Sequence, residues 1–252
     1  MKKVNSIVLF SVFLFLLNAC ASKQYIVKNT NGYLVEMNSR FDDNADLEMF
    51  SIVETYKNRL DAEMMEVVGE AAQPLTKSGT QSLLACFTAD AMQEYVTVNH
   101  EKADFAVINN GGLRTTLNKG PVTIGNLYEI YTFENRIVLI ELQGKYVKQL
   151  FDGFAQKSME GFSKSVQLKI KDKKTESLMI DGKPLDENAI YKVVTVDYLA
   201  EGNDGMQALT QAANYNDLGF TLRYMMIEYI KKLTAENIII YAKPDGRIEI
   251  EE

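Results

Sequence analysis

The sequence predicts a mixed-sheet α/β or α+β domain. Segments with apolar residues at three- and four-residue spacing, typical of helices, are interleaved with short β-branched apolar runs, typical of strands. Turn signals such as Asp181-Gly182 and Asp245-Gly246 lie next to strand segments and hairpins are frequent, so the sheets are expected to be mixed. A hydrophobic fraction of 46% is ample for a core. With no repeat and no Pro- or Ser-rich linker, one compact domain is the simplest prediction.

Residues 1–19 resemble a targeting segment. Lys2 and Lys3 precede an apolar run, Ile7 to Leu17, that is too short for a comfortable transmembrane helix. Leu17-Asn18-Ala19-Cys20 is similar to a bacterial lipobox, which predicts cleavage before Cys20 and its lipidation. The alternative is an ordinary secretory signal followed by a chance cysteine. We expect a protein of the bacterial cell envelope, lipid-anchored to a membrane, with its mature domain outside the cytoplasm.

The charge and cysteine content narrow the possible partners. The full chain carries a formal charge of −7, and removal of Lys2 and Lys3 makes the mature chain more acidic. Such a chain has no general attraction to nucleic acid. If Cys20 is lipidated, Cys86 has no partner for an internal disulfide, so stability must come from packing. Residues 20–40 are expected to form a lipidated tether with a hairpin, and residues 41–252 the domain.

The first half of the chain is predicted to hold a hairpin, two helices and one strand. Tyr25–Val27 and Tyr33–Val35 flank Asn31-Gly32, a hairpin signal. Apolar residues from Leu47 to Val67 predict a long amphipathic helix ending near Gly69, with its methionines in the core. A second helix is predicted over Thr80–Val98, with Cys86 as an inert, partly buried thiol and His100 solvated just past its end.

The second half of the chain alternates helices and strands. The strongest strand signal is Arg136–Leu142, and Val122–Ile130 is compatible with a short helix or a turn. A glycine-bearing loop, Tyr198 to Gly205, follows a buried strand. The remaining predicted elements are a helix from Gly144 to Ala155, a strand pair at Ser163–Lys171 and Glu176–Ile180, strands at Tyr191–Val196, Ile238–Tyr241 and Arg247–Ile250, and a helix at Thr221–Leu233.

Several catalytic chemistries lack their residues in this sequence. A single histidine cannot supply the usual zinc or dimetal site, and no Ser-His-Asp arrangement is visible around His100. The sequence has no Gly-x-Ser-x-Gly, no Gly-x-x-x-x-Gly-Lys and no Gly-x-Gly-x-x-Gly motif. A pair of carboxylates for glycoside hydrolysis is still compatible with the sequence, but no feature of the sequence marks a particular pair. We therefore name no catalytic residue, metal ligand or cofactor in this chain.

The stretch Asp104–Arg114 organises the chain. An apolar strand from Asp104 to Ile108 ends at four turn-forming residues, Asn109 to Gly112. Gly111 and Gly112 can bring bare backbone N–H groups close to a ligand, because glycine has no Cβ. Arg114 adds a planar fork of donors suited to phosphate or carboxylate. The alternative is a plain strand-to-loop turn with a solvated arginine.

Four stretches in order resemble the C-terminal domain of the 5′-nucleotidase / UDP-sugar hydrolase family. Asp104–Arg114 is similar to that family's strand followed by Asn-Gly-Gly-Gly-Ile-Arg, and the segment from Pro121 matches one that ends in Pro-Phe-x-Asn. Arg136–Lys145 matches the next element. Tyr191–Gly205 is similar to the family's aromatic followed by Gly-Gly-Asp-Gly. The resemblance covers roughly residues 45 to 250 and implies a four-layer α/β/β/α domain that holds a nucleoside or nucleotide.

The resemblance also implies roles for individual residues. Phe133 and Tyr198 take the positions of two aromatic rings that sandwich the base, and Asn135 the position of an amide at the base edge. Asp204 matches a carboxylate that accepts from ribose hydroxyls, and Arg114 a guanidinium at the phosphate end. From the residues alone, Phe133 and Tyr198 would pass as core aromatics, Asp204 as a turn former and Asn135 as a cap.

The chain departs from the family pattern at several positions. Asn110 and Asn203 replace glycines, Thr132 replaces a proline, and Glu134 stands where a small residue is common. The arginines that precede the second helix in the family are missing, and Lys77 is the only cation in that stretch, which makes phosphate binding harder to predict than base stacking.

The family's dimetal phosphoesterase domain normally lies before this one, where a signal peptide is predicted in this sequence. Three hypotheses follow. The chain is the substrate-binding half of a split nucleotide phosphohydrolase, with divalent metals held only by a partner metallophosphoesterase. Alternatively it is a stand-alone nucleoside-binding lipoprotein, or a degenerate interaction domain.

Overall fold

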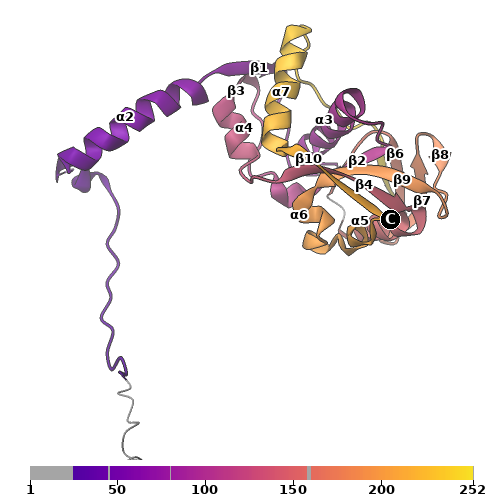
Figure 1. Ribbon diagram of the computed structural model, residues 1–252, viewed down its shortest axis with the longest axis horizontal. Helices are drawn as coiled ribbons and strands as arrows, with labels where there is room; N and C mark the ends of the chain where they lie inside the picture. Colours follow the sequence, from indigo (N-terminus) through magenta and orange to yellow (C-terminus); the bar gives the residue numbers. More distant parts are fainter. Residues whose placement is uncertain (1–24, 45, 80, 158–159, 252) are drawn as a thin grey trace, which may run out of the picture. The chain divides into compact units, whose positions relative to one another are not determined.

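A computed structural model describes residues 25–44, 46–79, 81–157 and 160–251 (Figure 1). The predicted signal peptide and Cys20 lie outside the described residues. The chain divides into two units, one ending at Ser51 and the other beginning at Ile52, and each is described by itself. No helix in the described part of the chain is long and apolar enough to span a bilayer.

The first unit corrects the hairpin prediction. Residues 25–38 form no strand, and Tyr25, Tyr33 and Leu34 are almost fully exposed. A lone two-stranded hairpin with no surface to cover is marginal in water, so the Asn31-Gly32 turn signal has no sheet to join. A short 3-10 helix, Ser39–Asn44, follows.

Helix α2, Leu47–Met64, is preceded by Asp46, whose carboxylate caps it by accepting from the backbone N–H groups of Glu48 and Met49. The helix ends earlier than predicted, because Val67 and Gly69 belong to strand β1, Val67–Ala71. The prediction of a buried apolar face with core methionines is also wrong, since no residue of α2 is buried. Periodicity shows that a helix has an apolar face but not that the chain covers it.

The second unit is built on a five-stranded sheet in the order β10-β4-β9-β2-β5. Strand β2 runs parallel to β9, whereas β4 is antiparallel to both β9 and β10, and β5 is antiparallel to β2. The sheet is therefore mixed, as predicted. Its strands are β2 Phe105–Ile108, β4 Arg136–Gln143, β5 Gly161–Phe162, β9 Ile190–Val196 and β10 Asn214–Thr221.

Two smaller sheets complete the β-structure of the described residues. A four-stranded sheet has the order β11-β6-β7-β8, with β11 parallel to β6, and β1 pairs antiparallel with β3. The mixed α/β class with mixed sheets is confirmed. The additional strands are β3 Gly120–Thr123, β6 Val166–Lys171, β7 Lys174–Ile180, β8 Lys183–Pro184 and β11 Ile248–Glu251.

Helices cover both faces of the five-stranded sheet, and every residue of its strand β2 is buried. Helix α3 packs on β2, β5 and β9, whereas α5 packs on β4, β9 and β7; Figure 1 shows α3 and α5 on opposite sides of the strands. Helix α7 packs on α3, α4 and β1. These helices are α3 Leu83–Asn99, α4 Ile124–Ile130, α5 Gly144–Lys157, α6 Asp197–Ala200 and α7 Leu222–Ala235.

Two strand assignments differ from the sequence prediction. Strand β10 was not predicted, because it has few apolar residues and its side chains are exposed or half-buried at the sheet edge. Conversely, residues 238–241 make only an isolated bridge, Ile240 to Ala71, and Ile240 is the only buried residue of these four. A run of apolar residues next to a turn signal therefore predicted a strand where the chain forms only a single bridge.

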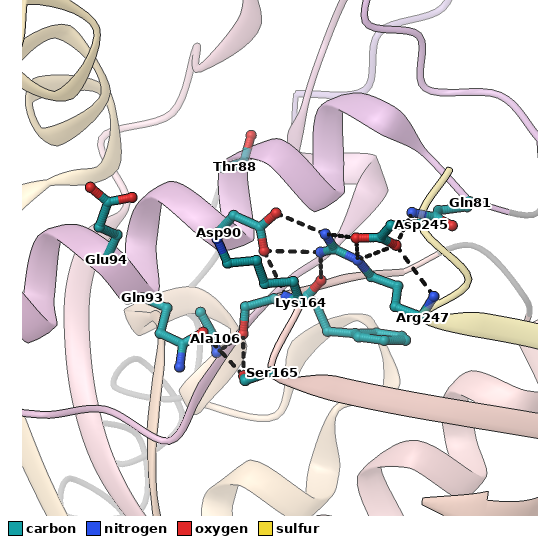
Figure 2. A network of polar contacts seen from close by, with 12 residues as sticks. Gln81, Thr88, Asp90, Gln93, Glu94, Ala106, Lys164, Ser165, Asp245 and Arg247 are labelled. Carbon is teal, nitrogen blue, oxygen red and sulfur yellow. Dashed lines mark hydrogen bonds and ion pairs between the residues drawn. The ribbon is translucent and has the colours of Figure 1, made fainter. Parts of the chain in front are cut away.

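A buried arginine fixes the C-terminal strand to the rest of this unit. Arg247 is 5% exposed; its guanidinium donates to both carboxylate oxygens of Asp90 on α3, at 3.0 and 2.8 Å, and to Asp245 (Figure 2). It also donates to the carbonyl of Phe162 in β5. Burial alone would raise the pKa of Asp245, but Arg247 outweighs this and lowers that pKa to about 2. The network therefore ties the last strand to α3 and β5.

Candidate functional site

The site lies where three neighbouring strands of the five-stranded sheet end. Strand β2 ends at Ile108 and its parallel neighbour β9 ends at Val196, so both carboxyl ends face the same edge. Strand β4 runs the other way and places Ile137 opposite Val196, so its amino end reaches that edge too. The loop after β2, helix α6 after β9 and the segment before β4 therefore meet.

A cavity of about 330 Å³ opens at this edge. The structure brings all seven predicted site residues together around it, although they are far apart in the sequence. One further residue, Asn109, also lines it and was not predicted, although it begins the Asn-Asn-Gly-Gly turn. The lining residues are Asn109, Gly111, Gly112, Arg114, Phe133, Asn135, Tyr198 and Asp204.

The glycine loop after β2 is shaped by Asn109, which is 4% exposed. Residues Asn110–Gly112 form a single 3-10 turn, closed by the Gly112 N–H donating to the Asn109 carbonyl at 3.3 Å. A Cβ at Gly112 would lie 2.6 Å from the Asn109 amide oxygen, so no larger residue fits there without moving Asn109. Gly112 is therefore required by its close contact with Asn109, while the expected approach of the loop backbone to a ligand stays a prediction.

Asp204 connects the two halves of the site. Its backbone is left-handed, with φ 53° and ψ 24°, in the turn Asn203–Gly205. The Tyr198 hydroxyl donates to Asp204 Oδ1 at 3.0 Å, and the Asn109 amide donates to Asp204 Oδ2. The carboxylate hydrogen bond raises the pKa of Tyr198. Asp204 is thus more than the turn former that its letter alone suggests.

Phe133 and Tyr198 flank the cavity as exposed rings. Their exposed fractions are 48% and 40%, so neither is a core aromatic. Among the ring pairs of the described residues, none joins one to the other. The Arg114 guanidinium lies over the Phe133 ring, 5.8 Å from its centroid, and donates to the Gly111 carbonyl at 3.2 Å. The cavity therefore combines two apolar ring surfaces with one cation and one carboxylate.

Sequence comparisons identify the family of this chain. The model of the 5′-nucleotidase, C-terminal domain, matches residues 67–211, more than half of the chain. The chain belongs to this family. It is 24% identical over 205 residues to protein UshA of Escherichia coli, across 80% of this chain and 37% of UshA. It is 28% identical over 222 residues to endonuclease YhcR of Bacillus subtilis, across 82% of this chain and 17% of that protein.

A solved structure agrees with this assignment. The 5′-nucleotidase precursor of Thermus thermophilus superposes with a TM-score of 0.69 at 26% identity, covering 81% of this chain and 43% of the other. The chain thus spans well under half the length of these relatives. The comparisons identify the fold and the family of the domain. Each of these relatives also contains a large region without a counterpart in this sequence.

One residue that departs from the family motif, Asn110, forms hydrogen bonds with residues outside the glycine loop. Asn110, at a glycine position of the motif, donates from its amide to the Lys77 carbonyl at 2.9 Å and accepts from Ser82 Oγ at 2.9 Å. Ser82 is the N-cap of α3. Burial, and then the charge of Arg114, lower the pKa of Lys77. The asparagine thus fixes the glycine loop to the segment that carries Lys77, next to Arg114.

Arg223 on α7 positions the segment that carries Phe133. The Arg223 guanidinium is buried; it donates to the carbonyls of Tyr131 at 2.8 Å and Thr132 at 3.2 Å, and pairs with the Glu134 carboxylate. It also lies over the Tyr128 ring. Glu134, another residue that departs from the family motif, is therefore the partner of an arginine 89 positions away. No sequence signal marked Arg223, because only the fold brings the two together.

The other reactive groups lie apart from the cavity. Burial raises the pKa of the Cys86 thiol to about 11, which agrees with the predicted inert thiol, although Cys86 is fully rather than partly buried. His100 ends α3 and stacks on Phe220 at 5.3 Å, with its surface exposed as predicted. In the described ranges, no group of three or more His, Cys, Asp or Glu side chains could hold a metal.

We predict that Arg223→Met lowers the free energy of unfolding by about 2 kcal/mol, because it leaves the Tyr131 and Thr132 carbonyls without their donor. Urea unfolding measures this. Glu134→Gln is the matched control: the Glu134 side chain is 74% exposed, so its loss should change stability by well under ~1 kcal/mol. Equal losses in the two variants would show that the ion pair, rather than the carbonyl contacts, holds the segment.

Proposed function

We propose that this domain binds a nucleoside or nucleotide in the cavity formed by the strand ends. The observation that carries the proposal is the pair of exposed rings, Phe133 and Tyr198, on one cavity of about 330 Å³. A flat, apolar base stacks on aromatic faces, and such stacking contributes ~1–3 kcal/mol per base. Stacking tolerates different bases because each has a π-face.

The polar groups of the cavity support the same ligand class. Asp204 presents a carboxylate, which accepts hydrogen bonds from sugar hydroxyls. The Asn135 side chain carries both donors and an acceptor for a base edge. Arg114 provides the cation that a phosphate requires, and Lys77 lies close enough for their charges to interact. We place the base between the rings, the sugar at Asp204 and any phosphate toward Arg114.

We further propose that the chain serves as the substrate-binding half of a nucleotide phosphohydrolase. Hydrolysis would be performed by a metallophosphoesterase on another polypeptide, whose divalent metals activate water. Membership of the 5′-nucleotidase C-terminal domain family supports the substrate class. The exposure of both rings to solvent supports a site that a second protein could reach.

Calorimetry with adenosine and uridine tests the binding site. Phe133→Ala should weaken binding by about ten- to a hundredfold, since one stacking face is lost. Its melting temperature should stay close to that of the parent, because the ring is half exposed. Tyr241→Ala, which removes an exposed ring outside the cavity, is the control and should bind like the parent.

One binding result and one melting result would contradict the binding proposal. A parent protein that binds neither nucleoside would leave the cavity without its ligand. A Phe133→Ala variant that melts several degrees early would mark the ring as a core residue instead.

An assay of phosphate release tests the division of labour. The mature chain without its lipidated cysteine, residues 21–252, should release no phosphate from AMP with Mg²⁺, Mn²⁺ or Zn²⁺, and should raise the rate when added to a metallophosphoesterase from the same organism. Phe133→Ala is the control and should give a smaller increase. Metal-dependent hydrolysis that follows the chain through purification and is lost in Arg114→Ala would refute the split arrangement.

A further inference from the structure

The Tyr198 hydroxyl is part of a hydrogen-bonded chain in the wall of the cavity. It donates to one oxygen of Asp204, and the Asn109 amide donates to the other oxygen. The direction of the first bond follows from chemistry, because an ionised carboxylate only accepts. Tyr198 makes this hydrogen bond and still faces solvent, since it is 40% exposed and lines the cavity.

This arrangement makes the cavity wall at Tyr198 and Asp204 rich in hydrogen-bond acceptors. The single proton of the Tyr198 hydroxyl is directed to Asp204, so toward a ligand the phenolic oxygen acts through its lone pairs. A carboxylate accepts up to about four hydrogen bonds, so donors of the protein and of a ligand can share Asp204.

Two adjacent acceptors are complementary to two adjacent donors. A vicinal diol supplies these from neighbouring carbons, as the 2′- and 3′-hydroxyls of a ribose do. A sugar without these hydroxyls would leave the carboxylate and the phenol facing carbon, at the cost of desolvating both. The ring face of Tyr198 and its hydroxyl edge can act together, because the sugar is attached at the edge of a stacked base.

We propose that Tyr198 is a specificity-determining residue that selects ribosides, its phenolic oxygen and the Asp204 carboxylate each accepting from one hydroxyl of a vicinal diol. This inference rests on the proposed nucleoside site and refines it: stacking is shared by all nucleosides, whereas the diol contact separates ribonucleosides from dideoxyribonucleosides. Asn109 is then a positioning residue, because its amide holds the carboxylate from the opposite side.

The test compares adenosine with 2′,3′-dideoxyadenosine on the full mature chain by calorimetry. Tyr198→Phe retains the ring and removes only the hydroxyl. Adenosine should bind about three- to tenfold more weakly to this variant, as expected for one hydrogen bond, whereas dideoxyadenosine should change by less than about twofold. Asp204→Asn should remove most of the preference for adenosine, because an amide in place of the carboxylate presents a donor to the diol.

The outcomes separate this inference from the proposed function. If the parent binds adenosine and Tyr198→Phe weakens both ligands equally, or neither, the hydroxyl does not read the sugar and the inference is wrong while the nucleoside site stands. If the parent binds no nucleoside, both are wrong. Thermal melting of each variant identifies any loss caused by unfolding, and 2′-deoxy- and 3′-deoxyadenosine show which hydroxyl contacts Tyr198.

Discussion

The pairing of β9 with β2 on one side and β4 on the other is the constraint on which the site depends. Parallel pairing of Phe105 with Val193 sets the carboxyl ends of β2 and β9 level, and antiparallel pairing of Ile137 with Val196 brings in the start of β4. A shift of one residue in either register would exchange the two faces of the strand and set each buried valine or isoleucine against the wrong neighbours. Burial of this sheet on both faces therefore also fixes the position of every side chain around the cavity.

The cavity wall is held by polar contacts that reach across the domain. Arg223 binds the carbonyls before Phe133, Asn110 binds the segment of Lys77, and Asn109 binds Asp204. Each contact joins segments far apart in sequence. A binding wall made of short turns needs such support, because turns have few packing contacts of their own and a ligand is bound best by groups already in place. The unusual residues of this chain, Asn110 and Glu134, are thus part of the support.

Much of the fold could be predicted from local patterns. Strands such as Arg136–Leu142 and helices such as Gly144–Ala155 have strong periodicity, and the structure reproduces them within a few residues. The grouping of Phe133, Tyr198 and Asp204 followed from motif resemblance and strand ends. The hairpin at Asn31-Gly32, the buried face of α2 and strand β10 could not be judged correctly, because each depends on whether another surface is present. Arg223 was not predicted as part of the site, because only the fold brings it to Glu134 and to the carbonyls of Tyr131 and Thr132.

The central claim is that a base inserts beside Phe133. The chain contains no tryptophan, so Phe133→Trp creates a single fluorescent reporter at that position while keeping an aromatic face. Titration with adenosine should quench its emission saturably, because the base stacks on the indole, and ribose 5-phosphate should not. Tyr241→Trp, outside the cavity, is the control and should give no saturable change. Indole emission of the Phe133→Trp variant that stays unchanged at millimolar adenosine, while the variant melts like the parent, would contradict the account.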